Sequence, residues 1–356
     1  CEIYLPRQNS NGLDFSEPEF INSIAKNLEV FKKDRITALS ITSLELGSTH
    51  KSDILSLCDE SNIGVVHCSD PDSIHHSSFQ ISTEWMNTSF DHRAAVLNDV
   101  ANSLESQSWQ FIYLLIHEAG KTIQDAHDEI REAVDFLRYY ANRSALFNSQ
   151  STQSGPTGED NILEYCPKGL VACISPWNFP LAITLGQIAA ALVTGNTVIA
   201  KASEETSLTA FKAATLFFNH GLPKDALHLL LGDGRVGQAI ITSQALDLVV
   251  FTGSLKTAKS IHNSLSNKPG KIVPLIAETG GLNSMVVDSS ALIERACDDI
   301  MRSAFNSAGQ RCSALRLLLV HETIYQELII MLKGMMSELI VGNPSNSSVD
   351  MGPIIS

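Results

Sequence analysis

The sequence predicts an α/β fold built around a doubly wound parallel sheet. From residue 165 onward, short apolar runs with strand character alternate with segments of helical periodicity. Repeated strand–helix–strand units form parallel sheets with right-handed crossovers, and ligands bind at the carboxyl ends of their strands. The predicted strands are 169–175, 197–200, 227–231, 247–251 and 271–277, and the predicted helices are 183–192, 207–219, 236–243 and 257–265.

The region before this core has a different pattern. Between about residues 18 and 145 it is mainly helical, most clearly in 109–121 and 126–140. For the second of these helices we expect a buried face with Ile130, Val134 and Leu137 and a solvated face with Glu129, Arg131 and Glu132. Residues 143–161 are rich in Ser, Gln, Gly, Pro and Asn, and this composition predicts a linker or an excursion from the domain.

The composition is that of an ordinary globular protein. With 356 residues, 44% of them hydrophobic and 18% charged, the chain is long enough for two domains rather than one. The net charge of −14 disfavours direct contact with nucleic acid, although a local pocket can still accept an anion. The longest apolar stretches, 179–193 and 328–341, contain polar residues, so neither predicts a membrane span.

The cysteines favour reduced thiols in a cytoplasmic protein. There are seven, an odd number, and they lack the spacing of a disulfide framework. Cys58, His67 and Cys68 could form a zinc cluster, but no Cys-x-x-Cys pair accompanies them, and His75-His76 fits a plain surface equally well. We therefore expect no metal site.

Cys312 and Glu278 are the candidates for covalent chemistry. Cys312 lies in a Gly-containing loop between a helical segment and an apolar strand, and Glu278 ends another apolar strand. A thiol nucleophile and a carboxylate base are the groups needed to make and hydrolyse a thioester. A structural cysteine is equally common, but the loop context and the adjacent Arg311 favour a reactive thiol.

Asn178 is a candidate hydrogen-bond donor. It follows Trp177 in a turn bounded by Pro176 and Pro180. A rigidly held carboxamide beside a nucleophile can donate to a developing oxyanion. Asn in such a turn is also ordinary turn chemistry, so the residue alone decides nothing.

Two strand ends carry groups that suit a dinucleotide. Gly253 follows a predicted strand and opens a helix, whose N-terminus favours a pyrophosphate, although the sequence is not GxGxxG and a tight turn alone would explain the glycine. Lys201 and Glu204 follow another strand and could hold ribose hydroxyls, or form only a surface ion pair. The two motifs together favour a dinucleotide more than either does alone.

Five motifs resemble the NAD(P)-dependent aldehyde dehydrogenases. They are SPWNFP (175–180), GNTVIAK (195–201), VVFTGS (249–254), ETGG (278–281) and GQRCS (309–313), and their order and spacing fit as well. The flanking segments 114–141, 186–201 and 277–288 resemble the glutamate-semialdehyde (pyrroline-5-carboxylate) dehydrogenase branch, and most of all the dehydrogenase domain of bifunctional proline utilization A enzymes. Residues 6–16 resemble the entry to that domain, so the resemblance covers nearly the whole chain.

The resemblance implies a role for each matching residue. Cys312 is implied as the nucleophile, Glu278 as the general base, and Asn178, with the Cys312 backbone N–H, as the oxyanion hole. The implied substrate contacts are Arg311 and Ser313, and no residue is implied as a metal ligand. The implied cofactor contacts are Ile174, Ser175, Pro176, Trp177, Lys201, Ser203, Glu204, Gly234, Gly237, Phe251, Thr252, Gly253, Ser254, Thr257, Thr279 and Gly280.

The implied activity is the oxidation of L-glutamate γ-semialdehyde to L-glutamate in proline catabolism through a cysteine thioester. NAD is the implied cofactor, since Glu204 should repel the 2′-phosphate of NADP. FAD is expected only in a proline dehydrogenase domain of the parent protein, through which peripheral membrane association could arise. The intact enzyme is expected to be a cytoplasmic homo-oligomer. Two alternatives stay open, a coenzyme A-acylating semialdehyde dehydrogenase and an inactive NAD-binding fragment.

The resemblance also suggests a division of the chain. We expect 1–142 as the N-terminal helical part of the NAD-binding domain, 143–164 as a linker or β-flap used in oligomerisation, 165–278 as the Rossmann-like core and 279–356 as the first part of the catalytic domain. Ala202 and Ala258 stand where many relatives have Pro and Gly. The Glu-x-Phe-Gly-Pro segment of the family is absent from the sequence, so we expect this chain to be a piece of a longer enzyme.

Overall fold

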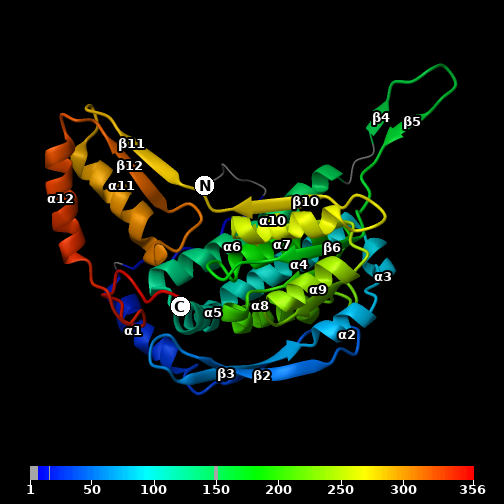
Figure 1. Cartoon of the computed structure of the whole chain (residues 1–356), viewed down its shortest axis with the longest axis horizontal. Helices are drawn as coiled ribbons and strands as arrows, with labels where there is room; N and C mark the ends of the chain where they lie inside the picture. The colour runs from blue at the N-terminus through cyan, green and yellow to red at the C-terminus, as the bar shows by residue number, and fades with distance from the viewer. Residues whose placement is uncertain (1–6, 16, 148–150) are drawn as a thin grey trace.

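A five-stranded parallel sheet forms the centre of the computed structural model, which describes residues 7–15, 17–147 and 151–356 (Figure 1). Its strand order is β10-β9-β6-β7-β8, and every neighbouring pair runs parallel. The strands are β6 (Leu170–Ile174), β7 (Thr197–Lys201), β8 (Leu227–Leu230), β9 (Leu248–Gly253) and β10 (Leu275–Thr279). The chain starts in the middle, runs to one edge and returns to the other, so the predicted doubly wound sheet is confirmed.

Helices cover both faces of this sheet. They are α7 (Ala182–Val193), α8 (Ser207–Asn219), α9 (Gly234–Ser243) and α10 (Leu255–Ser266), with the short η3 (Glu204–Thr206) before α8. Along β6, Val171 and Cys173 join the core that contains α7 and α8, whereas Leu170, Ala172 and Ile174 join the core that contains α9 and α10. Burial on both faces explains why the strand is apolar throughout instead of alternating.

Helix α7 depends on distant residues for hydrogen bonds to the free backbone groups at its ends. It is mostly apolar, and its N-cap residue Leu181 makes no side-chain hydrogen bond to the first turn. At the other end, the indole Nε1 of Trp85 donates to the Leu192 carbonyl at 2.9 Å. The guanidinium Nε of Arg93 donates to the Val193 carbonyl, also at 2.9 Å. A buried cation at a helix C-terminus also interacts favourably with the helix dipole.

The N-terminal region is helical only in part. Its helices are α1 (Pro18–Glu29), α2 (Pro71–His76), α3 (Thr83–Met86), α4 (Phe90–Ser106), α5 (Ser108–Ala119) and α6 (Ile123–Ser144). The helical prediction is wrong for residues 36–69, which form a sheet of order β1-β3-β2 from β1 (Ile36–Ala38), β2 (Ser48–Leu55) and β3 (Asn62–Ser69). Strand β2 is polar and largely exposed, so the alternation that would have marked it as a strand is missing.

Helix α6 buries the predicted apolar face. Ile130, Val134 and Leu137 are each at most 2% exposed. The expected solvated face is wrong for Glu129, which is 1% exposed because it forms an ion pair with the buried Lys121. Arg131 and Glu132, assigned to the same face, are half-buried. Helical periodicity alone cannot distinguish a solvated charge from a paired one.

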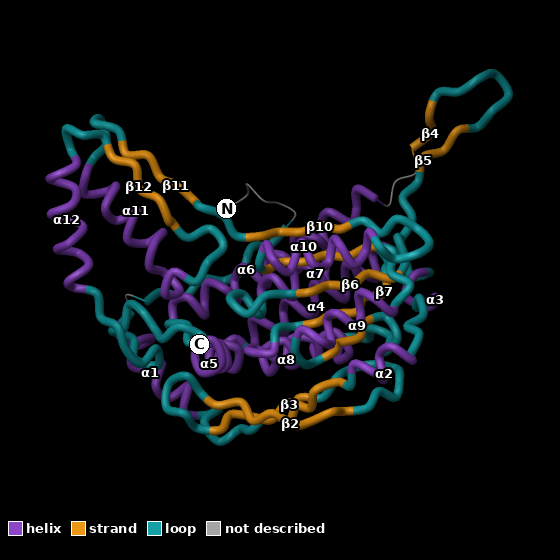
Figure 2. The backbone as a smooth tube through the Cα atoms, viewed as in Figure 1, coloured by secondary structure: helices purple, strands orange, loops and turns teal. Residues whose placement is uncertain are grey.

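A β-hairpin leaves the central body. Strands β4 (Ser151–Gln153) and β5 (Asn161–Leu163) pair antiparallel in a hairpin that projects outward after η2 (Ala145–Phe147), within the predicted linker (Figure 2). Residues 148–150 of that linker lie outside the described residues.

The last part of the chain is a smaller α/β unit. Strands β11 (Asn283–Val287) and β12 (Leu315–Val320) run parallel and pack with α11 (Ile293–Phe305) and α12 (Tyr325–Glu338) around the buried Cys297. The short η4 (Asn306–Gly309) joins α11 to the loop before β12. The chain then returns to the N-terminal helices, where Gly352 lies directly against the carbonyl of Gly120.

Candidate active site

A cavity of about 530 Å³ lies where the carboxyl ends of β6, β9 and β10 meet the loop before β12. Cys312, Glu278 and Asn178, the three predicted catalytic residues, all line it. Its other lining residues are Pro176, Trp177, Ile183, Thr252, Gly253, Ser254, Thr279, Gly280, Ala308, Gly309, Gln310, Arg311 and Arg316. The structure therefore brings together residues from four distant segments.

Cys312 lies exposed in a loop with an unusual backbone. Ser307, Ala308 and Gly309 have φ of 53°, 54° and 67°, so three consecutive residues adopt the left-handed conformation. For the two non-glycine residues this costs about 1–2 kcal/mol each. After the turn, the side-chain amide of Asn283 donates to the backbone carbonyl of Cys312 at 2.7 Å. The backbone of Cys312 is thus held in place while its thiol is exposed.

Asn178 lies directly beside this loop. Its Nδ2 donates to the carbonyl of Gln310 at 2.9 Å, and the residue is half-buried in the turn after β6. A carboxamide nitrogen has two N–H groups, so one orients the side chain and the second remains for another acceptor. The amide is thus held rigidly within the cavity that Cys312 lines.

Glu278 comes from the edge strand β10. It is paired in register with Thr252 on β9, and its side chain is exposed. The hydroxyl of Thr252 accepts a hydrogen bond from the Gln187 side chain of α7 at 3.0 Å, which ties this end of the sheet to the helix. A carboxylate at this position can accept a proton from water in the cavity.

The predicted cofactor residues fall into three groups by location, of which the third, with buried side chains, is described below. The first lines the cavity and consists of Pro176, Trp177, Thr252, Gly253, Ser254, Thr279 and Gly280. The second lies outside the cavity, at or near the carboxyl ends of β7, β8 and β9, and consists of Lys201, Ser203, Glu204, Gly234, Gly237 and Thr257. Because β9, β6, β7 and β8 are neighbours, these ends share one edge of the sheet, where dinucleotides bind in such folds.

The strand-end contacts suit a nucleotide. The ammonium of Lys201, almost fully buried, lies 3.0 Å from the half-exposed carboxylate of Glu204. Ser254 caps α10 by accepting from the Thr257 backbone N–H at 3.1 Å, so the turn after Gly253 leads directly into a helix N-terminus. A Cβ at Gly253 would come within 2.7 Å of the Phe251 ring, which explains the glycine.

Three predicted cofactor residues keep their side chains in the core. Ile174, Ser175 and Phe251 are 9%, 6% and 3% exposed. The Ser175 hydroxyl donates to Gln187 at 3.1 Å. These residues can offer only backbone groups to a ligand.

The two predicted substrate residues are placed differently. Arg311 lines the cavity, with its guanidinium 5.3 Å from the ring centroid of Phe179. Ser313 is exposed, and it is not one of the described residues that line the cavity. The half-buried Glu132 of α6 lies near Arg311. Burial, and to a smaller extent the neighbouring Glu129 carboxylate, raises the pKa of Glu132. Sequence periodicity placed Glu132 on a solvated face and so missed it.

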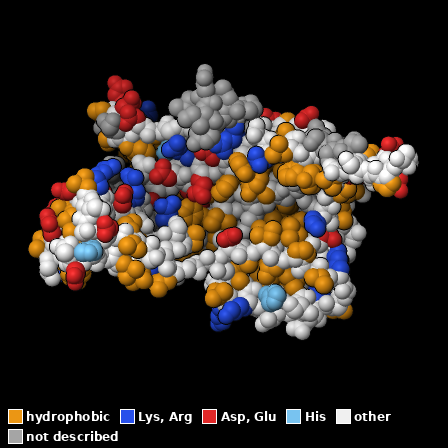
Figure 3. Space-filling model, turned by 90° about the horizontal axis from the view of Figure 1, so that it is seen from above, with side chains coloured by type: hydrophobic (Ala, Val, Ile, Leu, Met, Phe, Trp, Pro, Cys, Tyr) orange, Lys and Arg blue, Asp and Glu red, His pale blue; other side chains and the backbone are white. Residues whose placement is uncertain are grey.

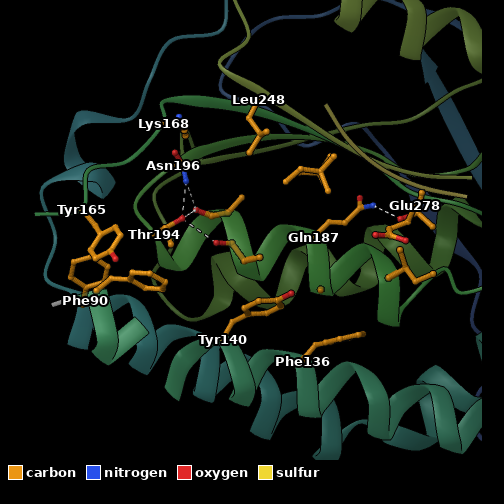
Figure 4. Close-up of a pocket in the computed structure, with 18 of the residues that line it drawn as sticks. Phe90, Phe136, Tyr140, Tyr165, Lys168, Gln187, Thr194, Asn196, Leu248 and Glu278 are labelled. Atoms are coloured by element: carbon orange, nitrogen blue, oxygen red, sulfur yellow. Dashed lines mark hydrogen bonds between the residues drawn. The ribbon is translucent and has the colours of Figure 1, made fainter. Parts of the chain in front are cut away.

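A second, largely apolar cavity of about 640 Å³ adjoins the first (Figure 4). The two share Ile183, Thr252, Glu278 and Cys312. Aromatic side chains line the second cavity, with Phe136 and Tyr140 stacked on α6 at 6.3 Å. Hydrophobic side chains also gather around a hollow on the face shown in Figure 3. The one-turn spacing of these two aromatics on α6 is a sequence feature that could have indicated this cavity.

Within the described residues, no three His, Cys, Asp or Glu side chains are grouped so as to hold a metal ion. No helix in the same part of the chain is long and apolar enough to cross a bilayer.

The chain belongs to the aldehyde dehydrogenase family, whose model matches residues 53–356. It is 39% identical over 358 aligned residues to the bifunctional protein PutA of Escherichia coli, covering 98% of this chain and 26% of that protein. It is 36% identical to 1-pyrroline-5-carboxylate dehydrogenase 2 of Bacillus subtilis, covering 76% of this chain and 54% of that protein.

Solved structures agree with this assignment. A mutant of Bradyrhizobium japonicum proline utilization A (PutA) is similar with a TM-score of 0.87 and 41% identity, over 100% of this chain and 34% of that one. A 1-pyrroline-5-carboxylate dehydrogenase from Thermus with bound NAD is similar with a TM-score of 0.91 and 26% identity, over 99% of this chain and 70% of that one. The chain thus spans about a quarter of the curated PutA proteins it matches.

Proposed function

We propose that the protein containing this chain oxidises L-glutamate γ-semialdehyde, the open form of 1-pyrroline-5-carboxylate, to L-glutamate with NAD. The observation that carries the proposal is the placement of Asn178, which donates to the Gln310 carbonyl at 2.9 Å beside the loop of Cys312. Glu278 lines the same cavity. The residues proposed as nucleophile, oxyanion donor and base therefore line one cavity. Similarity to PutA and 1-pyrroline-5-carboxylate dehydrogenases supports the choice of aldehyde.

The Cys312 thiolate attacks the aldehyde carbon and forms a C–S bond. The negative charge moves to the carbonyl oxygen, where the free N–H of Asn178 and the Cys312 backbone N–H stabilise it. Loss of hydride from this carbon leaves a thioester. Glu278 then takes a proton from water, which attacks the thioester and releases the acid and the thiolate.

NAD, when bound, supplies the acceptor for the hydride. Lys201 and Glu204 suit the hydroxyls of an adenosine ribose, because they form a donor–acceptor pair at a strand end. Trp177, Gly253 and Ser254 line the same cavity as Cys312 and would contact the rest of the nucleotide. The carboxylate of Glu204 disfavours a 2′-phosphate and therefore NADP.

The substrate carboxylate and the wider assembly are part of the same proposal. Arg311 supplies the nearest cation to Cys312 in sequence, and we assign it and Ser313 to the distal carboxylate. We also propose the division into 1–142, 143–164, 165–278 and 279–356, with the β4–β5 hairpin serving oligomerisation. FAD-dependent proline dehydrogenase activity, peripheral membrane association through that flavin domain and a cytoplasmic location belong to the proposal for the parent protein.

The test is single-turnover and steady-state kinetics of the complete gene product with the semialdehyde and NAD. Cys312→Ala should abolish turnover, and Glu278→Gln should give one burst of NADH followed by a stall, because thioester hydrolysis loses its base. Steady turnover by the Cys312→Ala variant would contradict the assignment. A coenzyme A-acylating enzyme would instead accumulate acyl-CoA when coenzyme A is added. We expect no acyl-CoA, because Glu278 would activate water to hydrolyse the thioester.

A further inference from the structure

We propose that two carboxylates of α6, Asp125 and Glu129, are positioning residues that align the nucleophile loop and the oxyanion-donor turn. The inference rests on the proposed function, since it concerns the same site. The two residues are four apart and therefore lie on one side of the helix, about one turn from each other. Each is hydrogen-bonded to the backbone of a different half of the site.

Glu129 holds the turn that carries Asn178. Its Oε1 accepts from the backbone N–H groups of Leu181 at 2.8 Å and Ala182 at 3.2 Å. Leu181 is the N-cap residue of α7 and Ala182 its first residue, and the Leu181 side chain cannot cap the helix. The carboxylate of Glu129 satisfies these backbone donors instead and complements the helix dipole. Asn178 lies three residues before Leu181, so the hydrogen bond to Glu129 fixes the end of the turn that carries Asn178.

Lys121 and Phe179 extend this arrangement toward Cys312. The Lys121 ammonium lies 3.0 Å from Glu129 Oε2, and both side chains are almost completely buried. The same ammonium lies 4.2 Å from the ring centroid of Phe179, the neighbour of Asn178. The guanidinium of Arg311, the neighbour of Cys312, lies 5.3 Å from that centroid. The Phe179 ring therefore lies near two cations, Lys121 from the connection before α6 and Arg311 from the loop of Cys312.

Asp125 holds the loop that carries Cys312. Its Oδ2 accepts from the backbone N–H of Ser307 at 3.0 Å and from the hydroxyl of Thr122, also at 3.0 Å. Ser307 is the first residue of the left-handed turn, so the contact offsets part of the backbone strain there. The two halves then meet through the hydrogen bond from Asn178 to the Gln310 carbonyl.

Glu118 provides a matched control for a purely structural role. It is fully buried and caps α8 as Glu129 caps α7, accepting from the N–H groups of Leu208 at 2.6 Å and Thr209 at 2.8 Å. The helix that it caps begins after β7 and carries neither Asn178 nor Cys312. Loss of a cap at Glu118 should therefore lower stability without moving the catalytic groups.

The experiment compares Glu129→Gln, Asp125→Asn and Glu118→Gln in the complete gene product. We expect the first two to lower kcat by about 10- to 100-fold at saturating NAD, less than complete loss of an oxyanion donor, with an unchanged KM for NAD. Glu118→Gln should lower the thermal midpoint but retain kcat. Because Glu129 acts through Asn178, adding Glu129→Gln to Asn178→Ala should cause no further loss.

A second measurement does not depend on turnover. The rate at which iodoacetamide alkylates Cys312, followed by peptide mass spectrometry in folded protein, should change several-fold in Asp125→Asn and stay the same in Glu118→Gln. If Glu129→Gln folds poorly, the double variant Lys121→Met/Glu129→Gln removes the unpaired lysine and takes its place. Wild-type kcat in the Glu129 variant, full additivity with Asn178→Ala, or an unchanged alkylation rate in Asp125→Asn would overturn the inference. A wild-type protein that oxidises neither the semialdehyde nor propanal would instead contradict the proposed function, and the alkylation rates would still test the positioning.

Discussion

Asn178 and Gln310 are joined by a hydrogen bond of 2.9 Å from the side-chain amide of the first to the backbone carbonyl of the second, although 132 positions separate them. The bond links the turn after β6 to the loop that ends at Cys312. It uses one of the two N–H groups of the amide and fixes the direction of the other. The donor is therefore oriented before any substrate arrives, which is what oxyanion stabilisation requires.

Replacement of Asn178 tests this orientation. We expect Asn178→Ala to lower kcat by about 10²–10³, the usual loss for one oxyanion donor, with little change in the KM for NAD. Initial-rate kinetics on the complete gene product measure both constants. Asn263→Ala, a change of the same type at an exposed position of α10, serves as the control. Equal kcat for the two variants would show that the amide does not meet the reacting oxygen.

Glu204 should decide the choice between NAD and NADP. Glu204→Gln removes a charged acceptor from the ribose and a repulsive charge from the 2′-phosphate position, so we expect the KM for NAD to rise roughly tenfold and that for NADP to fall. The neighbouring exposed Glu205→Gln should change neither value. Kinetics with each nucleotide give the comparison, and a Glu204 variant with unaltered preference would remove this residue from the ribose site.

The left-handed turn before Cys312 should store measurable strain. Ala308 has φ of 54°, so Ala308→Gly should raise the free energy of unfolding by about 1 kcal/mol, because glycine adopts this conformation freely. Ala304→Gly, in the neighbouring helix α11, should have the opposite sign and a similar size. Chemical denaturation of both variants checks the pair. Destabilisation by Ala308→Gly would mean that the turn is not strained there.

His228 should make the fold sensitive to acid. Burial lowers its pKa from 6.5 to about 4, while its ring Nδ1 lies 3.0 Å from the Thr42 hydroxyl. Between these values the unfolded chain binds the proton that the folded chain excludes, so stability falls as pH drops from 6.5 toward 4. The loss at the end of this window is about 3 kcal/mol.

Unfolding of His228→Gln at several pH values measures this contribution. The variant should show a flatter dependence over that window than wild type, while His262→Gln, at an exposed position, should not. An identical slope in wild type and His228→Gln would assign the acid sensitivity to other groups.

The sequence predicts the central sheet well because three of its strands, β6, β7 and β8, are fully buried. A short, continuous apolar run such as Leu170–Ile174 is typical of a parallel strand that is covered on both faces. Strand β2 could not be found in the same way, since Ser48–Leu55 is an exposed edge strand without apolar alternation. The prediction for Glu129 failed for a different reason, because helical periodicity does not show its partners, which are Lys121 in the connection before α6 and the backbone N–H groups at the start of α7.

The candidate site was predictable as a list of residues but not as an arrangement. Motif resemblance indicated Cys312, Glu278 and Asn178. The contacts that hold them, from Asp125 to Ser307 and from Asn178 to Gln310, join positions 182 and 132 apart. No periodicity or local propensity carries such pairings, since they arise only from tertiary packing.

The dependence of α7 on borrowed caps has a consequence for partly folded states. Glu129 satisfies one end of the helix, and Trp85 and Arg93 satisfy the other. A compact state with native helix content but loosened side-chain packing would lose these contacts before it lost its far-ultraviolet circular dichroism. Catalytic competence should therefore disappear ahead of secondary structure during mild denaturation, and activity would be the more sensitive reporter of whether this protein is correctly folded.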